Sequence, residues 1–449
     1  MTKPVSHTIL LLTGSLFSIF AVMALPGFYF HKDLETFWAW SQAWNRGWQE
    51  IYVTCPECNY PIIGLFSSAG LTGLTGLLQK LGYEKAVFVF RLFLAFVDGL
   101  NVFLVYWILK KLSIEKAAFW AGVMGVSISS WVGGALWGQI DGVSQFFILA
   151  TLAWIVKGNV DRWPSRAAFR IYLAGTGILL ACILLTKQLT LFSVFSISLL
   201  VAANLLFYSR AWKQVTLHSA LALAAFLATV SVWDLFLKLP APYFSHLHYI
   251  VQEGVYRGDI ISGNGFNLWM FLGRDMWSSA YVPLTANLPF FTPFWIGRLF
   301  FVIFVGLITS SLLLFLQEHL RGRETFLNRE VILNFIFFLA LVNLGFNIFL
   351  TGTHERYLYH FYPYIIVAVA GLESYSPIFT AKTRSLLVFG ASFYGIFILM
   401  ILSQIDFRLG YLPHWVMGIF HLGLLIYLTA VILRYQKFTA RAVSLKESV

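Results

Sequence analysis

Long apolar stretches separated by short polar breaks run along most of the chain. A helix needs about 20 apolar residues to cross the hydrocarbon core of a bilayer. Charges, or clusters of glycine and proline, interrupt runs of that length and divide the chain into about twelve predicted spans. Eleven and thirteen spans are the alternatives. The spans cover approximately residues 8–30, 85–109, 117–136, 142–157, 171–187, 190–208, 215–237, 293–316, 331–350, 357–373, 385–403 and 414–433. The pattern predicts an all-α fold, a polytopic transmembrane helical bundle that forms one domain over residues 1–449.

The composition is typical of a chain that uses lipid as its solvent. Of 449 residues, 59% are hydrophobic and 11% are charged, which is more apolar than a soluble domain of this size. The net charge is +11. The Lys and Arg residues are scattered in short loops, without a basic stripe or a nucleic-acid-binding motif, so nucleic acid is not expected as a partner.

The positive charges predict the orientation of the spans. Short connections on one side of the predicted bundle, with Lys3 and the tail from Arg434, hold 19 of the 31 Lys and Arg residues. Cytoplasmic loops are enriched in these residues, so both termini are predicted to be cytoplasmic. The two long connections, residues 31–84 and 238–292, are then extracytoplasmic. Their Trp, Tyr and Phe residues are typical of interfacial helices or of a plain aromatic belt.

A Cys-Pro-Glu-Cys tetrad lies in the first long connection, and no second pair of cysteines completes a zinc site. An extracytoplasmic compartment is oxidising. Cys55 and Cys58 are therefore expected to form a local disulfide rather than a redox or metal centre.

Two carboxylates, Asp33 and Glu35, follow the first predicted span. Acids favour helix N-termini, and a solvated helix start is one interpretation of both. A carboxylate fixed at the membrane edge is also suited to act as a base that removes a proton from a hydroxyl. Asp33 is the candidate for that catalytic role, and Glu35 is expected in the substrate pocket.

A glycine-rich turn joins the third and fourth predicted spans and reads Gly-Gly-Ala-Leu-Trp-Gly-Gln-Ile-Asp-Gly over residues 133–142. Turn chemistry explains the glycines. It does not explain Gln139 and Asp141 beside two apolar helices, so both are predicted to face a ligand.

A Thr-Lys-Gln motif over residues 186–188 separates the fifth and sixth spans. Lys187 is predicted on the extracytoplasmic side, against the charge bias. A lysine in this place either extends its amine to the interface or faces an anion in a cavity. The second interpretation makes Lys187 a candidate phosphate ligand.

The loop before the eighth span reads Ser-Gly-Asn-Gly-Phe-Asn-Leu-Trp over residues 262–269. Asx turns are one explanation of Asn264 and Asn267. Amide groups beside an aromatic ring also match sugar hydroxyls and ring faces, so both asparagines are candidates for a substrate pocket.

Three consecutive ionisable residues, His354, Glu355 and Arg356, lie at the predicted outer end of the ninth and tenth spans and are followed by Tyr357. Such groups are costly when they face lipid, so they are expected to face a cavity. The planar guanidinium of Arg356 is suited to hold a phosphate, and His354 can donate to a phosphate oxygen as negative charge grows there. Glu355 would hold either of them in place. An ion-pair cluster that only ties two helices together is the structural alternative.

Taken in this order, the motifs resemble those of the multi-pass C-type (GT-C) glycosyltransferases, particularly bacterial relatives of the mannosyl- and glucosyltransferases that use dolichyl- or polyprenyl-phosphate sugars. The resemblance runs from Asp33 to about Pro363. It implies a catalytic carboxylate at Asp33 and a donor phosphate cradled by His354 and Arg356. Many relatives carry an Asp-Tyr-Pro-Pro motif where this chain reads Asn-Tyr-Pro-Ile over residues 59–62, so a second acid is absent there.

The resemblance implies an inverting transferase that moves a hexose, mannose or glucose, from a polyprenyl-phosphate donor to a lipid or glycan acceptor on the extracytoplasmic side. The aspartate and the cationic pair are expected to meet at one site. No metal or cofactor is expected, because a charge-compensated polyprenyl phosphate is already a good leaving group. Membrane lipids are the other expected partners, and the chain has no Asn-x-Ser/Thr sequon, which agrees with a bacterial plasma (inner) membrane.

A secondary transporter or lipid flippase is the alternative function. Twelve spans fit such a protein, and the membrane-depth acids Asp98 and Asp234, with Lys187, would form an ion path. The two halves of the chain show no similarity, however, and the ionisable motifs cluster at one predicted face rather than at the midplane.

Overall fold

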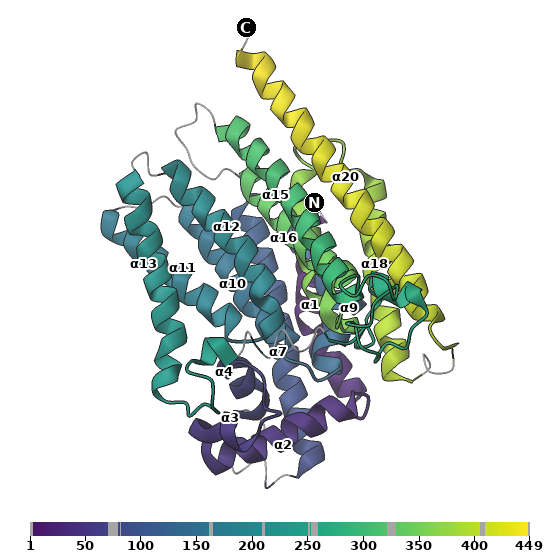
Figure 1. Cartoon of the computed structure of the whole chain (residues 1–449). Coiled ribbons are helices and arrows are strands. Elements are labelled where there is room, and N and C mark those ends of the chain that lie inside the picture. The colour runs from purple at the N-terminus through teal and green to yellow at the C-terminus, as the bar shows by residue number, and fades with distance from the viewer. Residues whose placement is uncertain are drawn as a thin grey trace. The chain divides into compact units, whose positions relative to one another are not determined.

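The computed structural model describes residues 3–70, 80, 82–160, 165–208, 212–249, 252, 259–320, 329–404 and 409–447. Within these ranges every named element is a helix (Figure 1), which confirms the predicted all-α fold. The chain divides into two compact units, which we call unit 1 (Met1–Gly254) and unit 2 (Val255–Val449). Each unit is described by itself.

Unit 1 contains the helices of the first seven predicted spans. They are α1 (Lys3–Ala24), α2 (His31–Gly47), α3 (Ile51–Thr54), α4 (Ile62–Leu65), α7 (Tyr83–Lys111), α8 (Ala117–Val126), α9 (Ile128–Trp131), α10 (Asp141–Val160), α11 (Arg166–Leu184), α12 (Leu191–Tyr208) and α13 (Trp212–Ser231). Short 3-10 or π segments are η1 (Trp48–Glu50), η2 (Phe66–Gly70), η3 (Val132–Leu136), η4 (Gln188–Thr190) and η5 (Val232–Leu235). Of the end of the first long connection, α4 and η2 are described, and residues 71–79 and 81 lie outside the described residues.

Unit 2 contains the helices of the last five predicted spans. They are η6 (Leu268–Leu272), α15 (Pro293–Leu320), α16 (Arg329–Phe349), η7 (Glu355–His360), α17 (Tyr362–Leu372), α18 (Ala381–Leu402) and α20 (Leu412–Glu447). The candidate span α16 is buried from Glu330 to Ile348.

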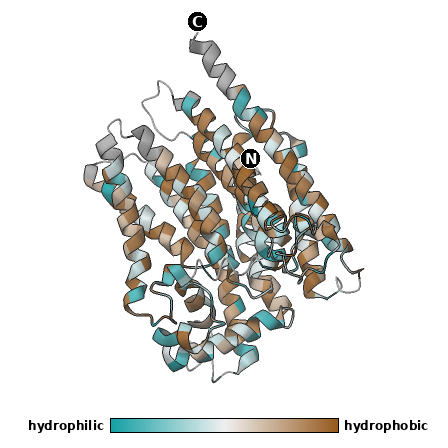
Figure 2. Cartoon of the chain, viewed as in Figure 1, coloured by the Kyte–Doolittle hydropathy of each residue, from teal (hydrophilic) through white to brown (hydrophobic). Residues whose placement is uncertain are grey.

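Eight described helices are long and apolar enough to cross a membrane, and their apolar residues appear brown in Figure 2. The bent pair Ala117–Val126 and Ile128–Leu136, at 67°, adds a ninth if its halves act as one span. This makes the chain a membrane-embedded, polytopic helical protein. The predicted count of twelve is not confirmed, because α10, α12 and α17 do not qualify within the described residues. Helix α17 has 11 residues, which at 1.5 Å per residue is about 16 Å, against a hydrocarbon core of about 30 Å.

Small residues allow the first helices of unit 1 to pack backbone to backbone. A side-chain carbon at Gly14 of α1 would lie 2.8 Å from the carbonyl oxygen of Gly122 in α8, and one at Gly125 would lie 2.6 Å from Gly14. A carbon at Gly99 of α7 would lie 2.5 Å from the Ser15 carbonyl oxygen. Such close approach is typical of membrane helices, whose association depends on packing rather than on expulsion of water.

The first long connection folds back onto the core of unit 1. The backbone amides of Ile63 and Gly64 donate to the Leu185 carbonyl at 2.9 and 3.1 Å. Helix α4 therefore satisfies a carbonyl at the end of α11, where the last four carbonyls lack partners within the helix. A side chain at Gly64 would overlap the backbone of Thr186, so glycine is required for this contact.

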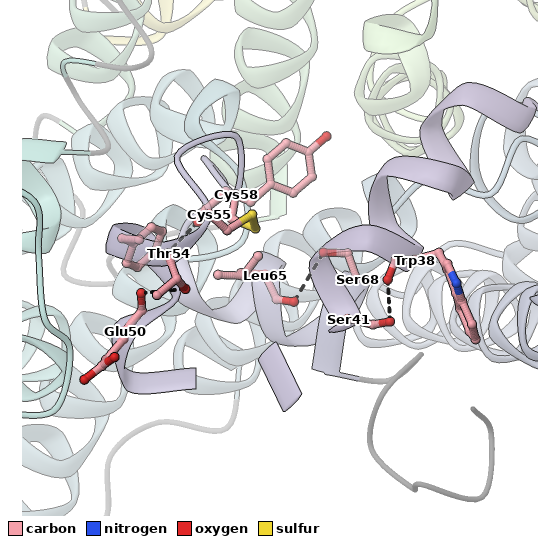
Figure 3. The surroundings of a disulfide bond; sticks show 10 residues. Trp38, Ser41, Glu50, Thr54, Cys55, Cys58, Leu65 and Ser68 are labelled. Carbon is pink, nitrogen blue, oxygen red and sulfur yellow. Dashed lines mark hydrogen bonds between the residues drawn. A yellow bond between two sulfur atoms is a disulfide. The ribbon is translucent and has the colours of Figure 1, made fainter. Parts of the chain in front are cut away.

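The disulfide expected between Cys55 and Cys58 is present, with the two Cα atoms 5.3 Å apart. Figure 3 shows it beside α3, where Thr54 donates to the Glu50 carbonyl at 3.0 Å. Both cysteines are buried. The bond closes the turn that leads from α3 to residue 60.

Candidate functional site

Asp33 lies in the first turn of α2 and is partly exposed. Its Oδ2 accepts hydrogen bonds from Trp137 Nε1 at 2.8 Å and from Gln139 Nε2 at 2.6 Å. Hydrogen bonds to an ionised acceptor are roughly twice as strong as neutral ones. The two donors therefore fix the orientation of the carboxylate, and the structure brings together two residues that the sequence proposed for one site.

The turn that supplies both donors is fixed to the start of α2. Gly138 has φ +93°, a backbone conformation that favours glycine, and a side-chain carbon there would lie 2.7 Å from Leu34. The Phe30 amide donates to the Trp137 carbonyl at 3.3 Å, and the two rings stack at 4.7 Å. Gly138 is therefore needed for the approach of α2.

Arg91 of α7 connects the end of α1 to η3. Its guanidinium is buried and donates to four backbone carbonyls at 2.5 to 3.3 Å. These carbonyls belong to Leu25, Pro26, Phe28 and Ala135. A guanidinium presents five N–H donors in one plane, so a single side chain can hold two segments at once. Arg91 thereby positions the connection that carries Asp33 against the turn that carries Gln139.

Asp141 and Lys187 form a buried ion pair. The Lys187 Nζ donates to Asp141 Oδ1 at 2.7 Å, and the side chains are 1% and 0% exposed for Lys187 and Asp141. Removing one partner of such a pair leaves a buried charge without compensation. The pair joins the start of α10 to the break after α11. The expected roles of Asp141 toward a ligand and of Lys187 toward a phosphate stay predictions.

Asn59 and Tyr60 of the first long connection contact the Thr-Lys-Gln motif. Gln188 Nε2 donates to the Asn59 carbonyl, and the Tyr60 ring lies 5.7 Å from Lys187 Nζ. The Tyr60 hydroxyl donates to Gln139 Oε1 at 3.4 Å. Polar contacts thus run from the Thr-Lys-Gln motif to the amide that holds Asp33.

Tyr52 and His246 hold the backbone of Tyr60. The Tyr52 hydroxyl donates to the Tyr60 carbonyl at 2.7 Å and lies 3.0 Å from His246 Nε2. Since its proton is used, the hydroxyl accepts from the neutral imidazole. Burial lowers the pKa of His246 to about 3, and burial raises the pKa of Tyr52 well above its ordinary value.

Three further acids of unit 1 that the sequence singled out are Glu35, Asp98 and Asp234. Glu35 is exposed on α2, two residues beyond Asp33. Asp98 of α7 accepts from Ser18 of α1 at 2.8 Å, and Asp234 accepts from the His246 amide at 2.7 Å. These contacts give Asp98 and Asp234 structural roles within unit 1. The expected pocket role of Glu35 stays a prediction.

In unit 2, His354, Glu355 and Arg356 form one charged cluster at the start of η7. Arg356 Nη1 donates to Glu355 Oε1 at 3.0 Å, and His354 Nδ1 lies 3.9 Å from Glu355 Oε2. Glu355 and Arg356 are buried, whereas the His354 side chain is 27% exposed. Tyr357 is buried behind the cluster, with its ring edge-on to His354 at 5.2 Å. Glu355 thus holds the Arg356 guanidinium through a hydrogen bond, and its expected role toward His354 stays a prediction.

The loop before α15 contacts the cluster through glycine. The Gly263 and Gly265 amides donate to the Thr353 carbonyl at 2.9 and 3.1 Å. A side-chain carbon at Gly263 would lie 2.5 Å from the His354 ring. Asn264, with φ +66°, pairs through its backbone with His354. The loop therefore fixes the place of the imidazole.

Asn267 anchors the same loop. Its Nδ2 lies 2.8 Å from the Ile261 carbonyl, 3.1 Å from the Leu350 carbonyl and 3.1 Å from Thr353 Oγ1. Its Oδ1 accepts from the Trp269 amide at 3.2 Å. The side chain is fully buried. These contacts support the turn interpretation of Asn267, and its expected role toward a sugar stays a prediction.

The expected residues therefore fall into two groups. Unit 1 holds Asp33, Glu35, Gln139, Asp141 and Lys187, and unit 2 holds Asn264, Asn267, His354, Glu355, Arg356 and Tyr357. Their expected meeting at one site stays a prediction. The sequence did not point to Arg91, Tyr52 or His246 as positioning residues, because their partners are backbone carbonyls or residues far along the chain.

Among the described residues, no group of three or more His, Cys, Asp or Glu side chains is arranged to hold a metal ion. Compared with protein-family models, with curated proteins and with solved structures, the chain gives no match.

Proposed function

We propose that the chain is an inverting glycosyltransferase that moves a hexose from a polyprenyl-phosphate donor to a lipid or glycan acceptor on the extracytoplasmic side of the membrane. The observation that supports this most is the Asp33 carboxylate, which is partly exposed and held by Trp137 and Gln139. A base that is fixed in orientation and open to solvent is what removal of a hydroxyl proton requires.

The cluster in unit 2 supports a phosphate-binding role. A guanidinium matches the geometry of a phosphate through paired N–H donors. Glu355 holds Arg356 in one orientation, and Gly263 together with Tyr357 holds the His354 ring. Cationic donors aimed at a leaving group stabilise the charge that develops there. Arg356 and His354 are the proposed ligands of the donor phosphate, and Lys187 is a third candidate.

The proposed reaction is a single displacement. Asp33 accepts the proton of the acceptor hydroxyl, and the oxygen forms a bond to the anomeric carbon. The bond between that carbon and the phosphate oxygen breaks, and polyprenyl phosphate leaves with the electron pair. Attack from the face opposite to the phosphate inverts the configuration. Arg356 and His354 compensate the charge of the departing phosphate.

Purified protein in liposomes with a radiolabelled short-chain polyprenyl-phosphate hexose tests this proposal. The expected result is hexose in a new lipid or glycan product, with release of an equal amount of polyprenyl phosphate. Movement of intact donor between leaflets without cleavage would instead identify a flippase. Substitution of Arg356 by alanine is expected to weaken donor binding, and unchanged affinity would place the phosphate elsewhere.

A further inference from the structure

An uncharged apolar loop, residues 284–291, lies just before α15 and exposes large side chains. Leu288, Phe290 and Phe291 are 55%, 83% and 46% exposed. The loop is closed by the Leu284 amide, which donates to the Phe291 carbonyl at 2.8 Å. Because its ends are joined, the loop presents these side chains in a defined conformation rather than as a loose chain.

The base of this loop is a folded structure with its own small core. Ile261, Trp269, Met276 and Phe294 are among its buried residues. The Ile261 amide donates to the Ser278 carbonyl, and the Phe294 amide donates to the Ala280 carbonyl, at 3.0 and 3.2 Å. The side chains of residues 288–291 remain outside this core, so the folded base does not account for them.

The exposed surface of the loop continues onto α15. Trp295, Leu299 and Phe300 are 53%, 55% and 41% exposed, and α15 is a candidate membrane span. Trp277 and Tyr281, also exposed, lie in the base of the loop. Trp and Tyr with one polar and one apolar part are enriched at membrane–water boundaries.

Arg298 is a charged residue near the start of the apolar helix α15. Its guanidinium lies 3.2 Å from the centre of the Phe294 ring, and Nη1 donates to the Phe294 carbonyl at 3.2 Å. The side chain thus turns back toward the start of the helix, as a cationic group does when it reaches from an apolar helix to head groups. Residues 288–291 lie just before the start of α15 in the chain.

We propose that residues 284–291 insert into the boundary between phospholipid head groups and acyl chains beside α15, as a wedge that anchors the loop carrying Gly263 and Asn264. The partner is the phospholipid of the adjacent leaflet. The loop that contacts His354 is joined to the base of this wedge, because the Ser262 amide donates to the Met276 carbonyl at 2.8 Å. Anchoring of the wedge would therefore hold that loop at a set depth in the membrane. The wedge does not depend on the proposed transferase activity.

A fluorophore at position 290 tests the proposal. Phe290→Cys is made in a Cys182→Ser background that retains the disulfide, is labelled with an environment-sensitive probe and is placed in nanodiscs of phosphatidylcholine and phosphatidylglycerol. Gln42→Cys, at an exposed polar position of α2, is the matched control. Quenching by lipid carrying a shallow doxyl group is expected to be about threefold or more stronger at position 290 than at position 42, with blue-shifted emission.

Equal accessibility of both positions to aqueous iodide, with no quenching by the doxyl lipid at position 290, would overturn the proposal. Shielding at position 290 that grows with the protein-to-lipid ratio would also overturn it, because a second copy of the chain would then cover the loop. With the probe at Leu288→Cys, the double substitution Phe290→Ser and Phe291→Ser is expected to abolish most of the doxyl quenching.

Discussion

The amide of Gln139 donates to Oδ2 of Asp33 at 2.6 Å, although the two residues are 106 positions apart in the chain. A hydrogen bond to a charged acceptor contributes about 1.5–3 kcal/mol. Substitution of Gln139 by leucine is therefore expected to lower kcat of sugar transfer about 10- to 100-fold, with little change in the KM for the donor. Trp137→Phe, which keeps an aromatic ring and removes the indole N–H that also donates to Asp33, is the matched variant. Full activity in both variants would show that the orientation of this carboxylate does not matter.

The ion pair of Lys187 with Asp141 predicts an unequal response to single and double substitutions. Lys187→Met alone is expected to destabilise the protein by about 3–5 kcal/mol, because Asp141 stays buried and charged. Lys187→Met combined with Asp141→Leu is expected to recover much of that loss in thermal unfolding followed by fluorescence. The donor affinity of the stable double variant then shows whether Lys187 binds the donor phosphate or only pairs with Asp141. An affinity equal to that of the natural protein would leave the lysine with a structural role only.

Gly263 is expected to tolerate no side chain, because a methyl group would lie 2.5 Å from the His354 ring. Gly263→Ala should lower donor affinity by displacing the imidazole, while the thermal unfolding temperature changes less than for a core substitution. Gly306→Ala is the control, since apart from its chain neighbours and the backbone of its own helix no atom lies within 4 Å of the position that its side-chain carbon would take. Titration of a short-chain donor into the solubilised protein gives the measurement. Equal affinities in the two variants would argue against a role for His354.

His246 predicts a loss of stability in acid. Burial lowers its pKa to about 3 in the folded protein, against about 6.5 when unfolded. The unfolded chain therefore binds a proton first, so the stabilisation is complete above about pH 6.5 and declines by about 1.4 kcal/mol for each pH unit below it, until the folded pKa is reached. Thermal unfolding at pH 7.5 and pH 5 measures this, and His246→Gln should reduce the difference. If the difference in stability between pH 7.5 and pH 5 is the same in His246→Gln, other groups cause the loss of stability in acid.

Much of the helical pattern could be predicted from hydropathy, because membrane helices must bury their backbone polar groups and carry about 20 apolar residues. Two details could not. Ser127, with ψ 131°, breaks the predicted span 117–136, where three serines lower the hydropathy without adding the charge that would have ended the span. Residues Glu355–His360 form a 3-10 segment, so α17 begins only at Tyr362, with a proline in its first turn. Local geometry of this kind leaves no mark on an apolar pattern.

The candidate site was predictable in its residue types and less so in its contacts. Asp33, Gln139 and Glu355 stand out because polar groups beside apolar helices need a reason. The partners of Arg91 could not be predicted, since they are backbone carbonyls, which every residue has. The pairing of Lys187 with Asp141 depends on two helices meeting, and sequence separation alone does not show it.

The role of Asp33 is tested most directly by Asp33→Asn in the liposome transfer assay, with donor binding measured on the same preparation. The substitution keeps the size and removes the basicity of the side chain. Hexose transfer is expected to fall about 10²- to 10⁴-fold, with donor affinity and thermal unfolding close to those of the natural protein. Transfer at the full rate in this variant would remove Asp33 from the mechanism and contradict its proposed role as the base.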